Sequence, residues 1–297
     1  FKQKTAYEIY QCDWSSDVCS SDLASSALVG QFDKAWLTQR DDQGIGLQDA
    51  MIAAGKNPRD IPLLRRDPSQ YLGFVEVHIE QGPVLHQHHL PLGVVTAING
   101  SVRYLIEITG VASHAGTSPM HQRHDAVAAF AEWAVFVEQR ARQDGDSVAT
   151  VGMLHVPQGS INVVPGLCRF SLDMRAPTDA QRDVLAKDIL QRLSDVCEQR
   201  GLQHHLEETV RAAAAPSDPQ LQQAWEQAVA KLGLPVHRLP SGAGHDAMML
   251  HRCMPQAMLF VRGENQGISH NPLECTTADD MQLAIDAFDT LLHLLSS

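Results

Sequence analysis

The order of apolar and polar positions along the chain predicts an α/β domain. Residues 72–79 (LGFVEVHI) form a nearly continuous apolar run, which is typical of a strand that is buried on both faces. A second buried strand is expected over residues 257–261, and an amphipathic helix over residues 276–295 follows it. Both ends of the chain therefore belong to one α/β architecture.

The segment between them, residues 101–212, predicts a separate module. Its expected elements are a strand at 104–109, a helix at 126–139, strands at 149–156 and 168–174, a helix at 180–199 and a strand at 204–210. This β-α-β-β-α-β order is typical of a ferredoxin-like fold. We therefore expect a parent domain, residues 24–100 and 213–297, that is interrupted by this module, with a hinge at residues 211–216.

The first 23 residues differ from the rest of the chain. They show no helical or strand period, and the runs Lys2–Ile9 and Cys12–Leu23 resemble translations of a sequencing-library adapter. We interpret residues 1–23 as a non-native artefact and exclude them from the fold argument. The natural gene is then expected to extend upstream of Ala24, which would make this chain a fragment.

Composition excludes several classes of protein. Lys and Arg total 23 against 35 Asp and Glu, and the net charge of -12 disfavours nucleic acid and anionic membranes as partners because both need a basic face. No apolar run reaches the ~18 to 20 residues of a membrane span and no signal-peptide pattern is present, so we expect a cytoplasmic protein. The 6 cysteines form no C-x-x-C pair, which favours reduced thiols.

Two histidines follow the predicted strands of the parent domain. His78 ends the first strand and His270 lies in a loop after the second, and ligands of α/β sheets gather at the carboxyl ends of strands. Each is either a metal ligand or an ordinary surface or core histidine. Glu76 and Glu80 flank His78, but the sequence gives no reason to assign them a role.

The inserted module contains three further candidates. His114, in a turn of small residues, either polarises a carbonyl group or caps the helix that follows. Arg175 either binds a carboxylate through its guanidinium or forms a salt bridge with Asp173. Asn162 is a polar residue at a strand end. In the parent domain, the Gly244 turn exposes backbone amides at the start of a short helix.

In this order along the chain, these segments resemble the zinc-dependent amidohydrolases of the hydantoinase/carbamoylase group, which includes allantoate amidohydrolase, N-carbamoyl-L-amino-acid hydrolase and β-ureidopropionase. The motifs of the resemblance are HIEQGP at 78–83, SHAGTSPM at 113–120, SINVVP at 160–165, DMR at 173–175, SGAGHDA at 241–247 and ISHNPLE at 268–274. The similarity covers nearly all of residues 24–297. It implies a metallopeptidase-like catalytic domain, here incomplete, that is interrupted by a ferredoxin-like lid through which two subunits pair.

The resemblance also implies roles for individual residues. The metal ligands would be His78 and His270, and the substrate-binding residues would be Gln81, His114, Asn162, Arg175 and Gly244, with His114 also catalytic. Two zinc or manganese ions bridged by hydroxide would supply a nucleophile at neutral pH. The family's other metal ligands and its general base lie upstream of the residues present here, so we expect this chain by itself to be inactive and to bind metal poorly.

The expected function is hydrolysis of a linear C–N bond in a ureido or carbamoyl acid, with allantoate or an N-carbamoyl-L-amino acid as substrate, by a cytoplasmic homodimer. The alternative is a non-catalytic dimerising homologue that binds small carboxylates through Arg175 and Asn162. An in-frame upstream segment with metal ligands would favour the enzyme. A native start near Ala24 would favour the alternative.

Overall fold

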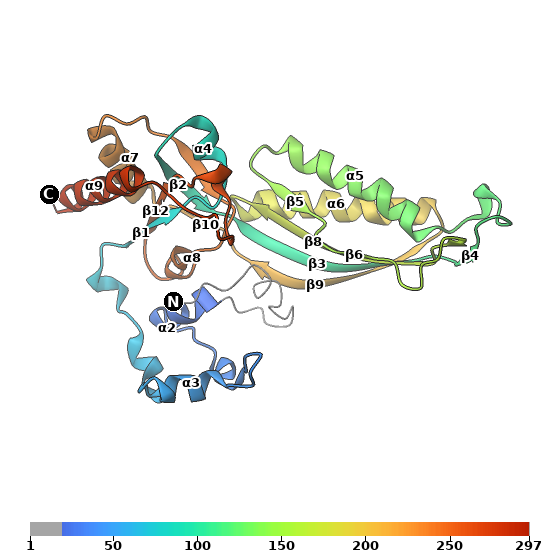
Figure 1. Ribbon diagram of the computed structural model, residues 1–297, viewed down its shortest axis with the longest axis horizontal. Helices are drawn as coiled ribbons and strands as arrows, with labels where there is room; N and C mark the ends of the chain where they lie inside the picture. The colour runs from blue at the N-terminus through green and yellow to red at the C-terminus, as the bar shows by residue number, and fades with distance from the viewer. Residues whose placement is uncertain (1–19, 297) are drawn as a thin grey trace. The chain divides into compact units, whose positions relative to one another are not determined.

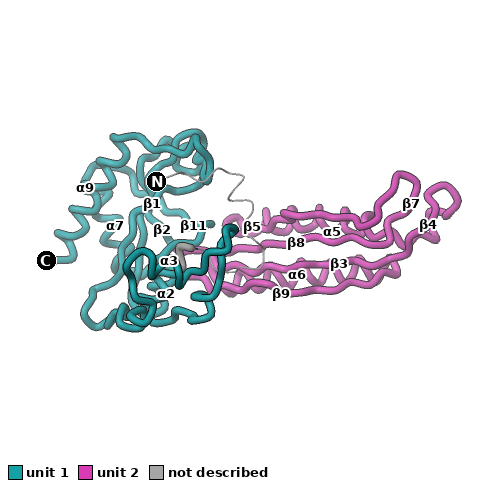
Figure 2. The backbone as a smooth tube through the Cα atoms, turned by 60° about the horizontal axis from the view of Figure 1, so that its bottom comes forward, with its two compact units in different colours: residues 1–96, 216–297 teal, residues 97–215 magenta. Residues whose placement is uncertain are grey.

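The chain consists of two compact units in a computed structural model that describes residues 20–296. Unit 1 comprises residues 1–96 and 216–297, and unit 2 comprises residues 97–215 (Figure 2). The predicted fold class, an α/β domain interrupted by an α+β module, is confirmed. Among residues 20–296, no helix is both long enough and apolar enough to cross a membrane.

Unit 1 contains a five-stranded sheet in which β12 (Gln256–Val261) is buried at every position. The strand order is β1-β12-β2-β10, and β11 also pairs with β2. β1 (Phe74–Ile79) runs parallel to β12, with His78 opposite Phe260. The other strands are β2 (Leu92–Ile98), β10 (Ala215–Pro216) and β11 (Arg238–Ser241).

Alternate residues of β1 contribute to different parts of unit 1. Val75 and Val77 pack against the apolar cluster formed with α7 (Pro219–Lys231) and α9 (Ala278–Leu295). Glu76, by contrast, accepts a hydrogen bond from the first turn of α8, a short helix at Asp246–Leu250. α2 (Ser20–Leu28) packs against α8. β1 is therefore shared between the core and a polar cluster.

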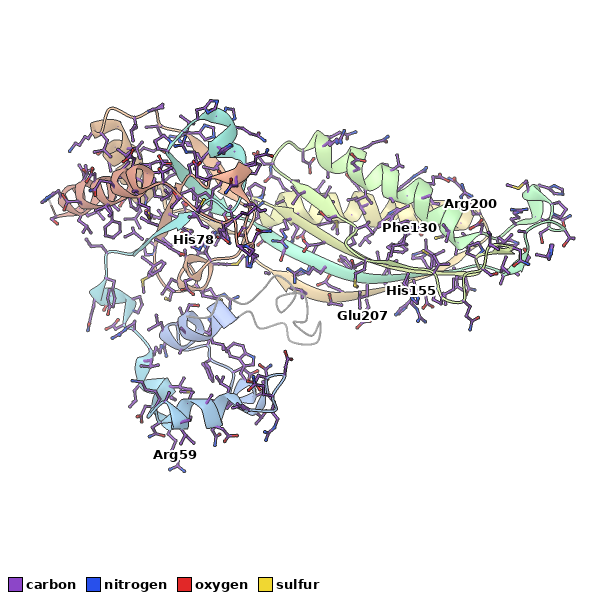
Figure 3. All side chains as sticks on the ribbon, in the orientation of Figure 1. Arg59, His78, Phe130, His155, Arg200 and Glu207 are labelled. Carbon is purple, nitrogen blue, oxygen red and sulfur yellow. The ribbon has the colours of Figure 1, made fainter. Side chains whose placement is uncertain are left out.

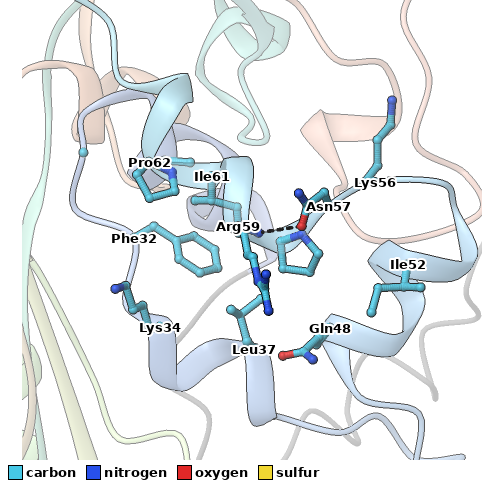
Figure 4. A pocket seen from close by; sticks show the side chains of 13 residues that line it. Phe32, Lys34, Leu37, Gln48, Ile52, Lys56, Asn57, Arg59, Ile61 and Pro62 are labelled. Carbon is cyan, nitrogen blue, oxygen red and sulfur yellow. Dashed lines mark hydrogen bonds between the residues drawn. The ribbon is translucent and has the colours of Figure 1, made fainter.

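Residues 20–72 form a series of short helices with few buried side chains. After α2 the elements are η1 (Lys34–Thr38), α3 (Leu47–Ala53), η2 (Pro58–Leu64) and η3 (Pro68–Gln70). Phe32, Leu37 and Ile61 line a cavity of about 1080 Å³ there (Figure 4), so this segment is loosely packed. The predicted artefact lies mostly outside the described residues. Only Ser20–Leu23, at the start of α2, are described, and the interpretation stays a prediction.

Unit 2 has the ferredoxin-like organisation that the sequence predicts. Its sheet has the order β5-β8-β3-β9, with β6 also paired to β8, and every pairing is antiparallel. The elements are β3 (Gly100–Thr109), α5 (Ala126–Gln143), β5 (Val148–Thr150), β6 (Leu154–His155), β8 (Leu167–Ala176), α6 (Asp179–Gln199) and β9 (Gln203–Ala212). Figure 1 shows α5 and α6 together over one face of this sheet.

Alternating residues of the strands in unit 2 separate a core face from a solvated face. Ile106 and Ile108 are buried beneath the two helices, where Trp133 donates its indole N–H to the Ile189 carbonyl at 2.9 Å. Thr178 caps α6, because its Oγ1 atom accepts the N–H of Gln181 at 3.2 Å. The alternation of buried and exposed residues is typical of an antiparallel sheet with one face against the core and one face in solvent.

The structure differs from one local prediction. Residues 149–156, expected as one strand, form the separate strands β5 and β6. The predicted hinge at 211–216 contains the boundary between the two units, which lies between Ala215 and Pro216. On the unit 2 side of this boundary, Arg182 donates to the Ala212 carbonyl at 2.8 Å and Asp179 accepts the Ala214 N–H at 2.9 Å, and mobility at the boundary stays a prediction.

The outer edge of β1 has no strand partner among the described residues. β1 is half-buried at each position, and apart from Glu76 and His78 its residues are apolar, with no lysine or proline at this edge. An apolar groove of about 590 Å³ lies between β1 and α9, where Met281 and Ile285 are 47% and 60% exposed. An unprotected edge beside an apolar groove favours self-association.

We expect the purified chain to form species larger than a dimer. The double substitution Met281→Lys and Ile285→Lys should reduce their amount, because it places charge in the groove and removes apolar surface. Sedimentation velocity at several concentrations measures this. The matched control is Ile52→Lys with Leu63→Lys, two exposed apolar positions elsewhere in unit 1. Equal association of both double variants, or a concentration-independent monomer of the unmodified chain, would contradict the expectation.

Candidate active site

The loops that contain His78 and His270 follow adjacent parallel strands, β1 and β12. His78 is the penultimate residue of β1 (Figure 3), and the chain continues from β12 into the loop of His270. Parallel neighbours place their carboxyl ends at the same edge of a sheet, which is where α/β proteins bind ligands. The topology of unit 1 therefore brings the two predicted loops to one edge.

Two glycines hold these loops in contact. Gly267 has a φ of +70°, and a Cβ atom built there would lie 1.6 Å from the carbonyl oxygen of Gly82. Only glycine allows both the backbone conformation and this approach. Glu80, which is 8% exposed, accepts the N–H groups of Val84 and Leu85 at 2.7 and 2.8 Å at the start of α4 (Val84–His88). Glu80 therefore fixes the turn after β1 as a helix cap.

Gln81 and His270 lie together in the paired loops. Gln81 Nε2 donates to Ser269 Oγ at 2.8 Å and lies 3.5 Å from His270 Nε2. Both residues have a left-handed backbone, with φ of +57° and +56°, which is uncommon outside glycine and often marks functional sites. The His270 N–H donates to Glu274 Oε2 at 2.8 Å. The structure thus joins a predicted metal ligand to a predicted substrate-binding residue.

His78 is grouped with two residues to which the sequence assigned no role, Glu76 and His245. The possible ligand atoms of the three side chains all lie within 4.8 Å of one another. The two imidazole rings are 4.6 Å apart at 67°, and Glu76 Oε1 is 3.9 Å from His245 Nδ1. Two imidazoles with a carboxylate are a donor set that suits a divalent metal. His270 is not a member of this group.

Burial shifts the pKa values of His245 and Glu76. Desolvation, and secondarily the nearby charge of His78, lowers the pKa of His245 to about 4. Desolvation also raises the pKa of Glu76, while the Ala247 N–H at 3.0 Å and the His78 charge act in the opposite direction. At neutral pH the His245 ring is therefore uncharged and offers a lone pair.

The sequence contained a signal for one of the two missed residues. Glu76 lies two positions before His78, so the side chains share one face of β1, and it is the only acidic residue in that strand. His245 follows Gly244 in a turn whose glycines are the more obvious feature. Its 4% exposure results from packing that no local pattern shows. At Gly244 itself, a Cβ atom would meet nothing within 4 Å, so the backbone is approachable.

In unit 2, His114 and Asn162 lie side by side. β4 (Ser113–His114) pairs with β7 (Val163–Val164), and the Ala115 N–H donates to the Asn162 carbonyl at 2.9 Å. The Gly116 N–H donates to His114 Nδ1 at 3.1 Å, so the proton of the neutral ring is on Nε2. His114 is exposed, and this tautomer offers a hydrogen-bond donor that can polarise a carbonyl group.

Arg175 is far from this pair within the same sheet. It lies opposite Ser101, whereas the turn of His114 begins beyond the Thr109–Leu167 pair. The eight residue steps from Leu167 to Arg175 correspond to about 26 Å at about 3.3 Å per step. Within one unit 2, Arg175 and His114 therefore do not meet on a small molecule.

The Arg175 guanidinium forms the salt bridge that the sequence left open. It binds Asp173 through two bonds of 2.9 Å, and Arg103 binds the same carboxylate at 2.9 Å. Although burial acts against it, these two guanidinium groups hold the pKa of Asp173 below its ordinary value. Two guanidinium groups therefore share the carboxylate of Asp173 at this end of the sheet.

Comparison with known proteins agrees with this arrangement. Residues 42–294 match the sequence profile of peptidase family M20/M25/M40. N-carbamoyl-L-amino acid amidohydrolase of Geobacillus stearothermophilus is 39% identical over 258 residues, which cover 87% of this chain and 63% of that protein. Allantoate amidohydrolase of Bacillus subtilis is 33% identical over 258 residues, which cover 86% and 62%. This chain thus spans somewhat less than two thirds of these two relatives.

A solved structure has the same fold. The amidase of the hydantoinase/carbamoylase family from Burkholderia multivorans superimposes with a TM-score of 0.83 at 30% identity, covering 91% of this chain and 65% of that one. The sequence-based resemblance to this group is confirmed.

Glu80→Ala should destabilise the chain by about 2 kcal/mol, because two amide groups at the start of α4 lose a charged acceptor. Glu80→Gln should cost less, since one amide oxygen remains as an acceptor. Thermal or urea unfolding followed by circular dichroism measures both. Glu138→Ala, at an exposed position of α5, is the control. Unchanged stability of Glu80→Ala would mean that the cap does not hold the loop.

Proposed function

The chain belongs to peptidase family M20/M25/M40, and on this premise we propose that the complete protein is an amidohydrolase that cleaves a linear C–N bond of a ureido or carbamoyl acid. Allantoate and N-carbamoyl-L-amino acids are the proposed substrates, because relatives at 33% and 39% identity have these activities in their names. The cytoplasmic location stays a prediction.

One structural observation supports this proposal most directly. The paired loops after β1 and β12 place Gln81 beside His270 at the edge where β1 also presents His78. Family membership alone would also fit a peptidase. The amide of Gln81, held beside His270, can form hydrogen bonds with a polar ureido group. The guanidinium groups of Arg103 and Arg175 at Asp173 can bind the carboxylate of the substrate.

The donor set fits a divalent metal, since His78 offers an imidazole next to the carboxylate of Glu76. In the complete protein, His78 and His270 would hold metal, zinc or manganese, which supplies an activated water and polarises the scissile carbonyl. The residues of the chain itself do the rest. Gln81 and the approachable backbone at Gly244 orient the substrate, and the Nε2 proton of His114 donates to its carbonyl oxygen.

The dimensions of unit 2 support a homodimer. Arg175 and His114 are about 26 Å or more apart along the sheet by the rise of a strand, which is longer than a ureido acid. If both act on one substrate molecule, they must come from different copies of the chain. We therefore propose that the His114 and Asn162 pair of one subunit completes the site of its partner, as the resemblance implies.

Ammonia release from allantoate and from N-carbamoyl-L-amino acids, compared with the amide analogues of the same compounds, tests the reaction and the role of Arg175. In the complete protein we expect metal-dependent turnover of the acids. Arg175→Ala should lower kcat/KM for the acids about tenfold to a hundredfold and affect the amides much less, since a charged hydrogen bond is worth about 1.5 to 3 kcal/mol. No turnover of any ureido acid by the complete, metal-loaded protein would refute the proposed function. Equal losses on acids and amides would make Arg175 structural.

Mixing two inactive variants tests the shared site. In the complete protein, His114→Ala and His270→Ala should each be nearly inactive. After they are unfolded, mixed and refolded, about half of the dimers are hybrids with one whole site each, so activity should return to about a quarter of the wild-type value. Hybrid dimers are verified by mass. Their failure to exceed the unmixed parents would show that His114 does not act across the dimer.

A further inference from the structure

We propose that Glu76, His78 and His245 form a zinc-binding site within unit 1, using side chains of this chain alone and no ligand from His270. The proposal goes beyond the hydrolase reaction and needs no substrate and no second subunit. It rests on which ring nitrogens are already engaged by the protein and which remain available to a metal.

His78 has one free ring nitrogen. Its Nδ1 atom lies 2.8 Å from the backbone carbonyl of Ile79. A carbonyl oxygen can only accept, so Nδ1 must hold the proton of the neutral ring. Nε2 is therefore the atom with an available lone pair. A histidine that donates one ring N–H to a backbone carbonyl while its other nitrogen stays bare is the usual arrangement of a metal ligand.

The hydrogen bonds around Ser241 fix the tautomer of His245. The Ser241 hydroxyl donates to the Ala243 carbonyl at 2.9 Å, and this uses its only proton. Ser241 Oγ, 2.8 Å from His245 Nε2, must then accept from that nitrogen. The ring proton is then on Nε2, and the lone pair remains on Nδ1, which lies 3.9 Å from Glu76 Oε1. His245 thus repeats the pattern of His78 with the two nitrogens exchanged.

Glu76 presents one oxygen to the same point. Its Oε2 atom accepts the Ala247 N–H at 3.0 Å, and this bond orients the carboxylate. Its Oε1 atom lies 3.9 Å from His245 Nδ1, which is too far for a hydrogen bond. These two acceptor atoms therefore lie near each other without a hydrogen bond between them. A metal ion could bind both of them.

The distances and the atom types favour zinc. In a four-coordinate zinc site, ligand atoms about 2.0–2.2 Å from the metal are about 3.3–3.5 Å from one another. The three donor groups here lie within 4.8 Å, so side-chain adjustments of about 1 Å close the site. Two imidazoles with one carboxylate are a known catalytic zinc set, whereas calcium and magnesium prefer oxygen ligands alone. A fourth position would remain for water.

Zinc binding to the purified, chelator-treated chain tests the inference. We expect one zinc ion per chain, measured by competition with a chromogenic chelator. We also expect cobalt, used as a spectroscopic substitute, to give the intense visible bands of a four-coordinate site. His245→Ala and Glu76→Gln should each weaken zinc binding about tenfold or more, because each removes a ligand. Glu76→Gln keeps an acceptor for the Ala247 N–H, so it separates ligand loss from misfolding.

Two control variants identify the ligands. His251→Ala removes a histidine of unit 1 that is outside the cluster, and His270→Ala removes the ligand that the family resemblance implies. Both should bind zinc as the unmodified chain does. The inference is overturned if the folded chain binds no zinc, if Glu76→Gln and His245→Ala bind normally, or if His270→Ala abolishes binding. No turnover is measured, so a negative result here leaves the proposed hydrolysis standing.

Discussion

The contact between Gly82 and Gly267 is the constraint on which the candidate site depends. Parallel pairing of β1 and β12 brings the two loops to one edge of the sheet, but it leaves their spacing open. The backbone approach at these glycines sets that spacing, since a Cβ atom at Gly267 would overlap the Gly82 carbonyl. Gln81 and His270 lie on either side of this contact, both with left-handed backbones, and their Nε2 atoms are 3.5 Å apart. Left-handed backbone costs energy at residues other than glycine. The contact between Gly82 and Gly267 compensates for this cost, as do the carboxylates of Glu80 and Glu274, which accept backbone N–H groups of the same loops.

β1 combines two roles that usually conflict in one strand. Its valines stabilise unit 1 by packing against α7 and α9, whereas Glu76 and His78 are polar groups on a half-buried strand. Such groups are costly to bury unless they are hydrogen-bonded. The Ala247 N–H satisfies one oxygen of Glu76, and the Ile79 carbonyl satisfies Nδ1 of His78. Each of the two side chains keeps a further ligand atom, and the possible ligand atoms of Glu76, His78 and His245 lie within 4.8 Å of one another.

Periodicity was sufficient to predict the fold because both units are dominated by it. The apolar stripes of α5 and α6 and the alternation in β3, β8 and β9 are local signals, and the ferredoxin-like order follows from them. The hydrogen bonds of Ala212 and Ala214 could not be predicted, since they depend on Arg182 and Asp179 of another element. The candidate site likewise has residues that a local pattern indicates and residues that only distant contacts reveal. His78 and His270 are identified by strand ends and motifs, whereas His245 became visible only through burial and through the hydroxyl of Ser241.

An imidazole nitrogen has a single lone pair, so each ring nitrogen of His78 can bind one metal ion at most. This limits how a site at Glu76, His78 and His245 can coexist with a site at His78 and His270. With Nδ1 of His78 bound to the Ile79 carbonyl, the residue can serve one ion through Nε2. An ion held by Glu76 and His245 is therefore the same ion that His78 would bind in the complete protein, and only its other ligands differ. His270 is outside that cluster and lies beside Gln81. If the complete protein holds a second ion, His270 would be its ligand from this chain, as the resemblance implies, and the contact between Gly82 and Gly267 would keep its loop beside the loop that follows β1.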